Sequence, residues 1–396
     1  MRGQKKIKGR LLWLSFQTVV ILIKQCRQTG EANTRFVELL SRLREGCCTN
    51  DDFNLLNTRL IDNCDPQLLT TQGWSTVPII VSDNAAKDSL NIHAVQQFAH
   101  ATGQTVHWYH AEDSWKGNLI QDPSLIGHLR DLSSGKTGQM LGRLPLVLGM
   151  RIYILHNFDV IHGIANGTTG ILRHIRYKLN AQKERILTSC IVETQTSGDC
   201  MPWLLLKQVP ILSSSNSFTI KHQYNNTMLT FSQRQVPICP AYSITAHKSE
   251  GQTLTNIIVD LKNTHGTEEP YVMISRVKSL DGLLILRPFD QKKIQCSMSQ
   301  EARSEHRRLH ELSLHILVQH GSPPTRDKAA AELHEINSLT PPCVSSTELI
   351  EGYNNPSKAK ESITHTLNTS FSTNHTPQRR LHDEQPLECR KRQRLI

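Results

Sequence analysis

The stretch that decides the fold is Ser243-Ile244-Thr245-Ala246-His247-Lys248-Ser249-Glu250-Gly251-Gln252-Thr253. Its first residues end a predicted strand, Val236 to Thr245, and the polar loop His247 to Thr253 follows directly. A loop at the carboxyl end of a parallel strand is where α/β folds bind ligands. This loop supplies an imidazole, an ammonium, hydroxyls, an amide and a glycine that lets backbone N–H groups approach closely, and such groups bind phosphates. An ordinary polar surface loop would contain the same residue types.

Apolar segments on both sides of this stretch alternate between strand and helix patterns. Strands are predicted at Phe16 to Ile23, Val77 to Val81, Val236 to Thr245, Ile257 to Val259 and Leu283 to Leu286. Helices are predicted around Phe36, Leu39, Leu40 and Leu43 (closed by Gly46), around Ile92, Val95, Phe98 and Ala99 (capped at Ser82 to Asn84), and at Tyr271 to Val277 and Arg303 to Val318. This alternation predicts an α/β domain with a doubly wound parallel sheet.

The pattern changes near Leu144, where short β segments and turns such as Asn166-Gly167 replace the helices. We therefore expect a small β-barrel at 144–234, inserted between the two parts of the α/β domain at 1–143 and 235–320. From residue 321 to 396, Ser, Thr, Asn, Pro and charged residues dominate, which predicts a disordered, basic tail.

Composition limits the class of partner. The formal net charge of +10 favours a polyanion as partner, and a nucleic acid before a membrane.

The ten cysteines include no Cys-x-x-Cys pair, and His107 and His110 lack a second ligand pair, so we expect reduced thiols, exposed histidines and no metal site. The apolar run Leu11 to Ile23 is too short to span a membrane and lacks a signal-peptide cleavage site, so we expect no secretion. The basic end Arg390 to Arg394 fits either a nuclear localisation signal or a solvated terminus, and the expected location is nuclear or cytoplasmic.

Two arginines stand where they could reach a phosphate. Arg276 lies in the segment Tyr271 to Val277, and its planar, permanent charge suits stabilisation of a transferring phosphoryl group. An ion pair between Arg276 and Asp281 is the structural alternative. Arg27 follows the first predicted strand, and an ordinary strand-end arginine is the alternative there.

Taken together and in this order, these elements resemble the C-terminal portion of the Pif-type (petite integration frequency) DNA helicases of superfamily 1, especially the forms carried by Helitron transposons. The matching segments are Arg27-Gln28 (motif IV), Ser243 to Thr253 (motif V), Tyr271 to Val277 (motif VI), Val77 to Val81 with Asn84 and Asn91, and Leu144 to Met150 with Asn166-Gly167. The resemblance covers roughly Phe16 to Val318. It implies that the α/β domain is the second RecA-like motor domain and that the insertion is the accessory β-barrel of the family.

The resemblance also implies a set of site residues. Contacts to the phosphates of ATP would come from Arg27, Gln28, Gly251, Thr253 and Arg276, with Arg276 as arginine finger and Arg27 facing the γ-phosphate. Contacts to single-stranded DNA would come from His247, Lys248, Ser249, Gln252 and Asn166. The chain departs from the family at Glu250, where the family usually has Gln. A carboxylate there would repel DNA phosphates unless Lys248 or another base neutralises it.

No Gly-x-x-x-x-Gly-Lys-Ser/Thr loop occurs in the sequence, although an ATP site of this kind needs one. Ser134-Gly135-Lys136-Thr137 is a partial match with Arg130 at the first glycine position, and Asp51-Asp52 does not follow a strand as a magnesium site should. We therefore expect the first motor domain to be missing, and ATP and Mg²⁺ to bind only where such a domain is present. The alternatives are a stand-alone module that binds single-stranded nucleic acid and an inactive transposon relic.

Overall fold

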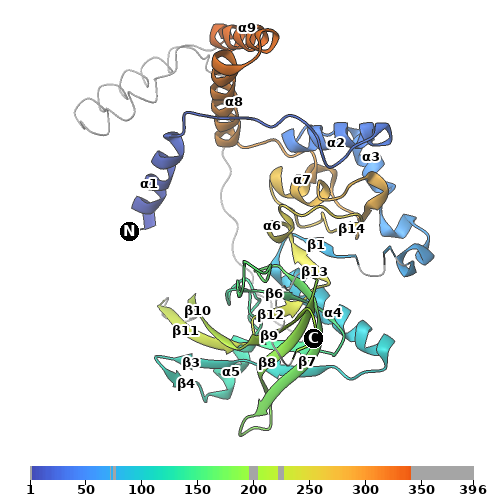
Figure 1. Cartoon of the computed structure of the whole chain (residues 1–396), viewed down its shortest axis with the longest axis vertical. Coiled ribbons are helices and arrows are strands. Elements are labelled where there is room, and N and C mark those ends of the chain that lie inside the picture. The colour runs from blue at the N-terminus through green and yellow to red at the C-terminus, as the bar shows by residue number, and fades with distance from the viewer. Residues whose placement is uncertain (1, 72, 75–76, 196–203, 222–226, 340–396) are drawn as a thin grey trace, which may run out of the picture. The chain divides into compact units, whose positions relative to one another are not determined.

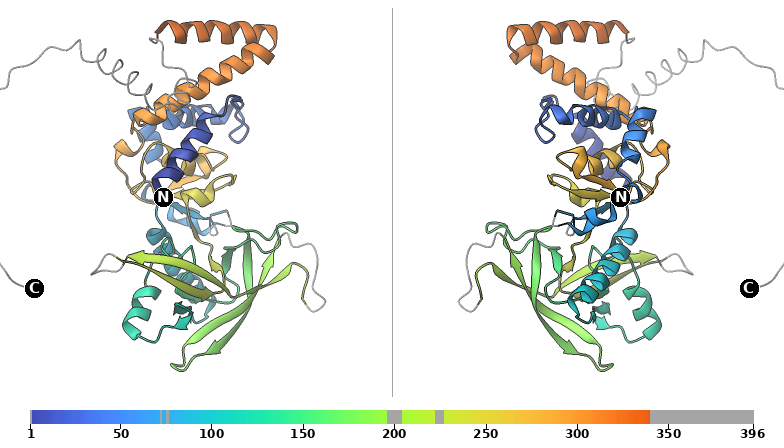
Figure 2. Two further views of the ribbon diagram at one scale, coloured as in Figure 1. Left: turned by 90° about the vertical axis from the view of Figure 1, so that its left-hand side faces the viewer. Right: turned by 90° about the vertical axis from the view of Figure 1, so that its right-hand side faces the viewer.

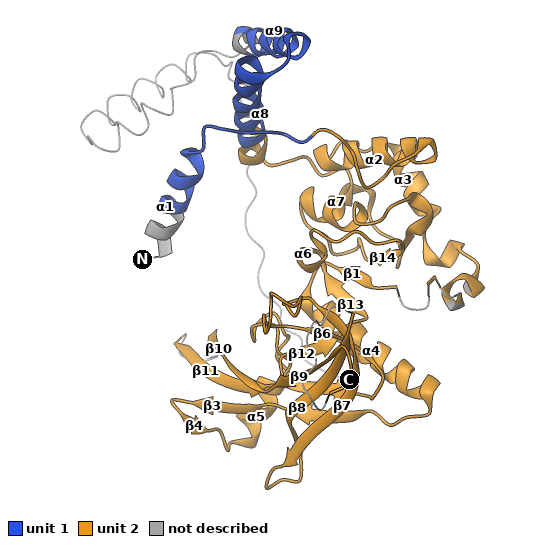
Figure 3. Cartoon of the chain, viewed as in Figure 1, with its two compact units in different colours: residues 1–22, 304–396 blue, residues 23–303 orange. Residues whose placement is uncertain are grey.

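The computed structural model describes residues 2–71, 73–74, 77–195, 204–221 and 227–339. The chain divides into two compact units (Figure 3): residues 1–22 with 304–396 form unit 1, and residues 23–303 form unit 2. All predicted site residues lie in unit 2.

Unit 1 is helical in its described part. It contains α1 (Arg2–Leu14), most of α8 (Gln300–His320) and α9 (Pro323–Leu339). His310 on α8 lies 2.9 Å from the Glu332 carboxylate on α9, and Ala329 is buried. Disorder was expected from residue 321, but this start is too early, because the segment around Lys328 to Glu335 is rich in strong helix formers. Residues 340–396 of the predicted tail lie outside the described residues.

Unit 2 contains a parallel four-stranded sheet. Its strand order is β13 (Ser243–Thr245), β1 (Ile79–Val81), β14 (Ile257–Val259), β15 (Leu283–Ile285). Ile80 pairs with Ile244 on one side and Val259 on the other, which makes β1 a central strand. The predictions at Val77 to Val81, Ile257 to Val259 and Leu283 to Leu286 are thereby confirmed.

Both faces of this sheet are covered. One face packs against α2 (Thr34–Glu45), α3 (Asn50–Asn57) and α7 (Glu268–Ile274) through the strand residues Ile80, Ile244, Ile257, Val259, Leu283 and Ile285. The other face carries Ile79, Ile258 and Leu284, which cluster with Trp74 and with the 3-10 helices η2 (Ile61–Asn63) and η3 (Pro66–Thr70). Adjacent strand residues point to opposite faces, so runs of apolar residues bury both. The predicted doubly wound α/β arrangement is confirmed.

Helix ends follow their predicted signals. Gly46 closes α2 in the left-handed conformation at φ 73°, and a Cβ at this position would lie 2.0 Å from the Cys296 carbonyl oxygen. The α3 N-terminus is a capping box between Thr49 and Asp52, and Asp52 also accepts two hydrogen bonds of 2.7 Å from Arg42. The carboxylate of Asp52 is therefore committed to the fold.

Helix α4 (Asn84–Thr102) links the sheet to the β-rich part of unit 2. The Asp83 side chain caps it, as predicted, by accepting a hydrogen bond from the Ala86 N–H. The Asn91 side chain accepts from the N–H groups of Tyr242 and Ser243 and donates to the Ser243 carbonyl oxygen. Asn91 therefore holds the start of β13 against α4.

The β-rich part forms a nearly closed, barrel-like arrangement that confirms the predicted inserted barrel (Figures 1 and 2). A seven-stranded sheet has the order β12-β6-β7-β8-β2-β5 with β9 added to β8, and a four-stranded sheet has the order β10-β11-β3-β4. The strands are β2 (His107–His110), β3 (Glu112–Trp115), β4 (Asn118–Leu119), β5 (Arg143–Leu146), β6 (Arg151–Ile154), β7 (Thr169–Leu179), β8 (Arg185–Thr194), β9 (Gln208–Leu212), β10 (Ser214–Lys221), β11 (Met228–Gln235) and β12 (Ile238–Pro240). The remaining short helices of the chain are α5 (Pro123–Arg130), α6 (Ala246–Ser249), η1 (Glu31–Asn33), η4 (Leu280–Gly282) and η5 (Gln291–Lys293).

Four details differ from the sequence-based expectations. The predicted strand Val236 to Thr245 is two strands, because β12 pairs with β6 in the seven-stranded sheet and β13 pairs with β1 in the parallel sheet. The strands at 107–119 pair with β5, β8 and β11, so the β-rich part recruits residues that precede the expected boundary at Leu144. His107 and His110, expected to be exposed, are half-buried on β2, and burial lowers the pKa of both imidazoles. Phe16 to Ile23, expected to be a buried strand, has no regular structure, and Ile23 is 92% exposed.

Candidate functional site

The loop after β13 begins as the one-turn helix α6 (Ala246–Ser249) and then reverses at Gly251, which has φ 76°. The Ser249 side chain is fully buried, and its hydroxyl donates to the Ala246 carbonyl oxygen at 2.6 Å. His247 is exposed, and its Nδ1 lies 3.4 Å from the Glu250 carboxylate. Among the predicted DNA contacts, Ser249 therefore stabilises the turn from inside, whereas His247 faces solvent.

Arg27 and Thr253 meet at the far end of this loop. The Arg27 Nε donates to the Thr253 hydroxyl at 3.0 Å, and Arg27 also donates to the Ser275 carbonyl oxygen at 2.8 Å. The neighbouring Gln28 is buried and donates to the carbonyl oxygens of Ser275 and Val277 at 3.1 and 2.6 Å. Arg27 and Gln28 are thus joined to two segments that lie more than 200 residues further along the chain, as the order of the motifs implied.

Arg276 lies beside Arg27. Its Nε donates to the Val272 carbonyl oxygen at 2.8 Å, and its terminal nitrogen donates to the Ser275 hydroxyl at 2.8 Å. Burial and then the nearby positive charge of Arg27 lower the pKa of Arg276. Within the described residues no ion pair joins Arg276 to an acid.

The structural alternative for Arg276, an ion pair with Asp281, is therefore not observed. The Asp281 carbonyl oxygen instead accepts a hydrogen bond of 2.8 Å from Arg59. Two guanidinium groups close together, held by neutral acceptors, form a positively charged surface that an anion would stabilise.

A pocket of about 280 Å³ lies on the other side of α6. It is lined by Tyr153, Asn166, Ile244, Lys248, Glu250 and Gln252. Three of the five predicted DNA contacts, Asn166, Lys248 and Gln252, are therefore brought together although Asn166 comes from the β-rich part and the others from the loop. Gln252 donates to the Lys248 carbonyl oxygen at 2.8 Å, which fixes the loop around the lysine.

The half-buried Lys248 supplies the positive charge in the lining of this pocket. No ion pair or side-chain hydrogen bond engages its ammonium in the part of the chain that the structure describes. Burial, with a further contribution from the nearby Lys87 ammonium, lowers the pKa of Lys248. A partly desolvated cation without a partner favours binding of an anion or of a strong hydrogen-bond acceptor.

The Ser134-Gly135-Lys136-Thr137 segment forms a turn whose polar groups are occupied. Ser134 donates from its backbone N–H and its hydroxyl to Asp88 at 2.8 and 2.9 Å, and its hydroxyl accepts from the buried Lys87 at 2.7 Å. The Thr137 hydroxyl contacts the Met140 carbonyl oxygen, and Lys136 is exposed. The turn has no free hydroxyl with which to cradle a phosphate.

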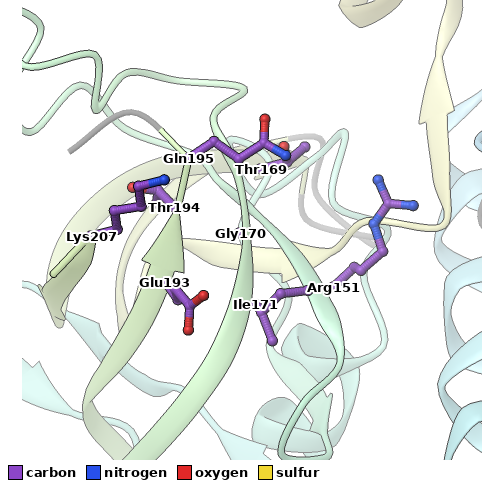
Figure 4. Close-up of a pocket in the computed structure, with 8 residues that line it drawn as sticks. All are labelled: Arg151, Thr169, Gly170, Ile171, Glu193, Thr194, Gln195 and Lys207. Carbon is purple, nitrogen blue, oxygen red and sulfur yellow. The ribbon is translucent and has the colours of Figure 1, made fainter. Parts of the chain in front are cut away.

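A second pocket, of about 230 Å³, opens on the barrel and contains none of the predicted site residues (Figure 4). Arg151, Thr169, Glu193 and Lys207 line it around Gly170. The Glu193 carboxylate is paired with Arg173 at 2.7 Å. In the described part of the chain no group of three or more His, Cys, Asp or Glu side chains could hold a metal ion, and no helix there is long and apolar enough to cross a membrane.

Sequence reasoning missed two contributors to these sites. The Ser275 carbonyl oxygen, which accepts from both Arg27 and Gln28, has no signature because every residue has a carbonyl. Tyr153 belongs to an alternating strand of the β-rich part, and only the pairing of β6 with β12 brings it toward β13.

Several known proteins are similar to this chain in sequence. No family model matches the sequence. The ATP-dependent DNA helicase PIF1 of Homo sapiens is 25% identical over 154 residues, which cover 39% of this chain and 20% of that protein. The protein of the same name from Xenopus laevis is 23% identical over 274 residues, covering 68% of this chain and 35% of the relative.

Among solved structures, the Pif1 helicase from Bacteroides in complex with ADP-AlF3 and ssDNA superposes with a TM-score of 0.50 and 21% identity, over 74% of this chain and 56% of that chain. This match shows a shared fold. The chain spans between 20% and 35% of the length of the two curated relatives. In sequence, the chain is therefore similar to the helicases named PIF1 over part of their length, and it shares the fold of a Pif1 helicase.

Proposed function

We propose that this chain acts as the second motor half of a Pif-type ATP-dependent DNA helicase. It binds single-stranded DNA beside α6 and contributes Arg27 and Arg276 to the phosphates of ATP. The phosphate loop that this site requires comes from a first motor domain, because the sequence contains no such loop.

The observation that carries the DNA-binding part is the half-buried Lys248, which has no partner among the described residues and shares a pocket with Asn166 and Gln252. A lysine ammonium contacts DNA phosphates as a point charge, and side-chain amides bind both phosphates and base edges. A related Bacteroides Pif1 helicase has been solved with ssDNA, which is consistent with this role.

Arg27, Arg276 and the Thr253 hydroxyl support the nucleotide part. Two guanidiniums within reach of one another, neither of them in an ion pair with a carboxylate in the described residues, fit the charge of a polyphosphate. ATP, when bound, supplies the phosphoryl group whose transfer drives the motor. The described residues contain no group of three or more His, Cys, Asp or Glu side chains that could hold Mg²⁺, so its ligands would come from the first motor domain. Arg276 would stabilise charge on the phosphoryl oxygens, while Gln28 and Ser275 hold Arg27 in position.

Binding of a fluorescent oligonucleotide at increasing salt tests the DNA-binding part. With roughly 3–5 phosphate contacts, the logarithm of affinity should fall against the logarithm of salt with a slope of about −2 to −3.5. Lys248→Ala should reduce the slope by about 0.7, whereas the exposed Lys262→Ala should leave it unchanged. Affinity that does not depend on salt, or equal effects of both variants, would show that the loop is not the DNA site.

A further inference from the structure

The pocket beside α6 contains both a cation and an anion. Lys248 supplies an ammonium that has no partner among the described residues, and Glu250, only two residues away, supplies a carboxylate that lies 3.4 Å from His247 and near enough to Arg276 to oppose the lowering of that guanidinium's pKa by burial. The side-chain amides of Asn166 and Gln252 complete the polar lining, and the ring of Tyr153 forms part of its apolar wall. This lining offers hydrogen-bond donors and acceptors in one small space.

A phosphate inside the pocket would not satisfy this lining. Lys248 attracts a phosphodiester of the strand, but the exposed carboxylate of Glu250 repels a phosphate from a position inside the pocket, because like charges close together oppose each other. A neutral group that carries both acceptors and donors would satisfy Glu250 and the two side-chain amides. Nucleobases are such groups, and the volume of about 280 Å³ lies just below the range typical of small-molecule pockets, which suits a single ring system.

The carboxylate also discriminates between bases. Glu accepts a hydrogen bond from the exocyclic amino group of cytosine, and the neighbouring cytosine acceptors can then face the side-chain amide of Asn166 or Gln252. Thymine presents a carbonyl oxygen where cytosine has its amino group, and a carbonyl oxygen and a carboxylate repel each other. A Gln side chain at this position could adapt to either base because it has both a donor and an acceptor.

We propose that this pocket receives one unstacked nucleobase of the bound strand, and that Glu250 makes the pocket select cytosine over thymine. The inference rests on the proposed binding of single-stranded DNA and adds a base preference to it. The sugar-phosphate backbone of the strand runs outside the pocket.

Binding of oligo(dC) and oligo(dT) of about 12 nucleotides to the full chain tests the proposal. At about pH 8, the wild-type chain should bind oligo(dC) roughly 5–10-fold more tightly than oligo(dT), the lower end of what one base contact provides. Glu250→Gln should reduce this ratio below about twofold, chiefly by improving binding of oligo(dT). The exposed Glu45→Gln is the matched control and should keep the wild-type ratio.

The DNA can be varied instead of the protein, which removes any question of misfolding. Oligonucleotides in which cytosine is replaced by pyrimidin-2-one lack the amino group and should bind the wild-type chain more weakly than oligo(dC). Equal wild-type affinity for oligo(dC) and oligo(dT), or a preference that Glu250→Gln leaves intact, would overturn the base pocket while the proposed DNA binding stands. Absence of binding to every oligonucleotide would overturn both proposals.

Discussion

Two loops of this chain contain residues typical of phosphate binding, and they differ in how their polar groups are used. In the turn at Ser134 to Thr137, the hydroxyls and a backbone N–H are engaged with Asp88, Lys87 and the Met140 carbonyl oxygen. In the loop from His247 to Thr253, the Lys248 ammonium lacks a partner in the described residues, and the adjacent guanidiniums bond only to neutral groups.

The difference teaches that residue types alone do not identify a phosphate site. A Ser-Gly-Lys-Thr turn whose polar groups are satisfied internally gains little from a ligand, because every new contact would break an existing one. A loop whose cations are partly desolvated and unpaired gains much more free energy when it binds an anion. The predictions that follow test this contrast between the two loops.

The largest effect is expected when Arg276 is substituted, and it falls on ATP turnover. When a first motor domain from a related helicase is fused to this chain, Arg276→Ala should lower ATP turnover by roughly 10³-fold, as expected for an arginine finger. Arg276→Lys should restore little, because a point charge lacks the planar fork of the guanidinium. Phosphate release measures the effect. An Arg276→Ala variant that unfolds as the isolated chain would instead identify Arg276 as a structural residue.

The next largest effect concerns the stability of the satisfied turn. Asp88 and Lys87 are both buried, and their side chains approach to 3.2 Å. Asp88→Ala would leave the Lys87 ammonium without its counter-charge and the Ser134 N–H without its acceptor. The free energy of unfolding should fall by about 3–5 kcal/mol, measured by chemical denaturation.

Asp131→Ala is the matched control for this prediction. Asp131 forms an ion pair with Arg143, but both side chains are largely exposed, so its removal should cost less than about 1 kcal/mol. Equal losses for the two variants would mean that the buried network around Ser134 does not hold the turn.

Part of this arrangement could be predicted from the sequence. The core strands, the closing glycine of α2 and the Asp83 cap of α4 follow local patterns that the sequence displays directly. The meeting of Arg27, Thr253 and Arg276 was implied only by the order of the motifs, since no local pattern relates residues so far apart.

The rest depends on long-range pairing. The β-branched residues from Phe16 to Ile23 favour an extended backbone, but a strand also needs a partner with free hydrogen-bonding groups, and the sequence does not specify one. The strands at 107–119 were missed because their partners β8 and β11 lie far along the chain. Ser249 was predicted to contact DNA from its residue type, whereas its burial depends on the one-turn helix α6.

A smaller effect on DNA affinity is expected when rising pH removes the charge of Lys248. Burial lowers the pKa of Lys248, and the protonated ammonium is the form that attracts DNA. Affinity for oligo(dC) should therefore decline with rising pH earlier than the ordinary pKa of lysine would allow. In Lys248→Ala this decline should be absent. A pH profile shared by the wild-type chain and Lys248→Ala would assign the decline to another group.

The smallest effect is expected at Lys136, the residue that most resembles the lysine of a nucleotide-binding loop. Lys136 is exposed, and the hydroxyls beside it already bind Asp88 and the Met140 carbonyl oxygen, so the turn cannot close around a phosphate. Lys136→Ala should leave DNA affinity, the melting temperature and nucleotide binding of the isolated chain within error of wild type. In the two-domain fusion, ATP turnover should also be unchanged, although Arg276→Ala abolishes it. DNA-stimulated ATP hydrolysis by the isolated chain that disappears in Lys136→Ala would reverse the contrast between the two loops. Such a result would require the Ser134 network to open when the nucleotide binds, and Asp88→Ala should then increase nucleotide affinity rather than only destabilise the fold.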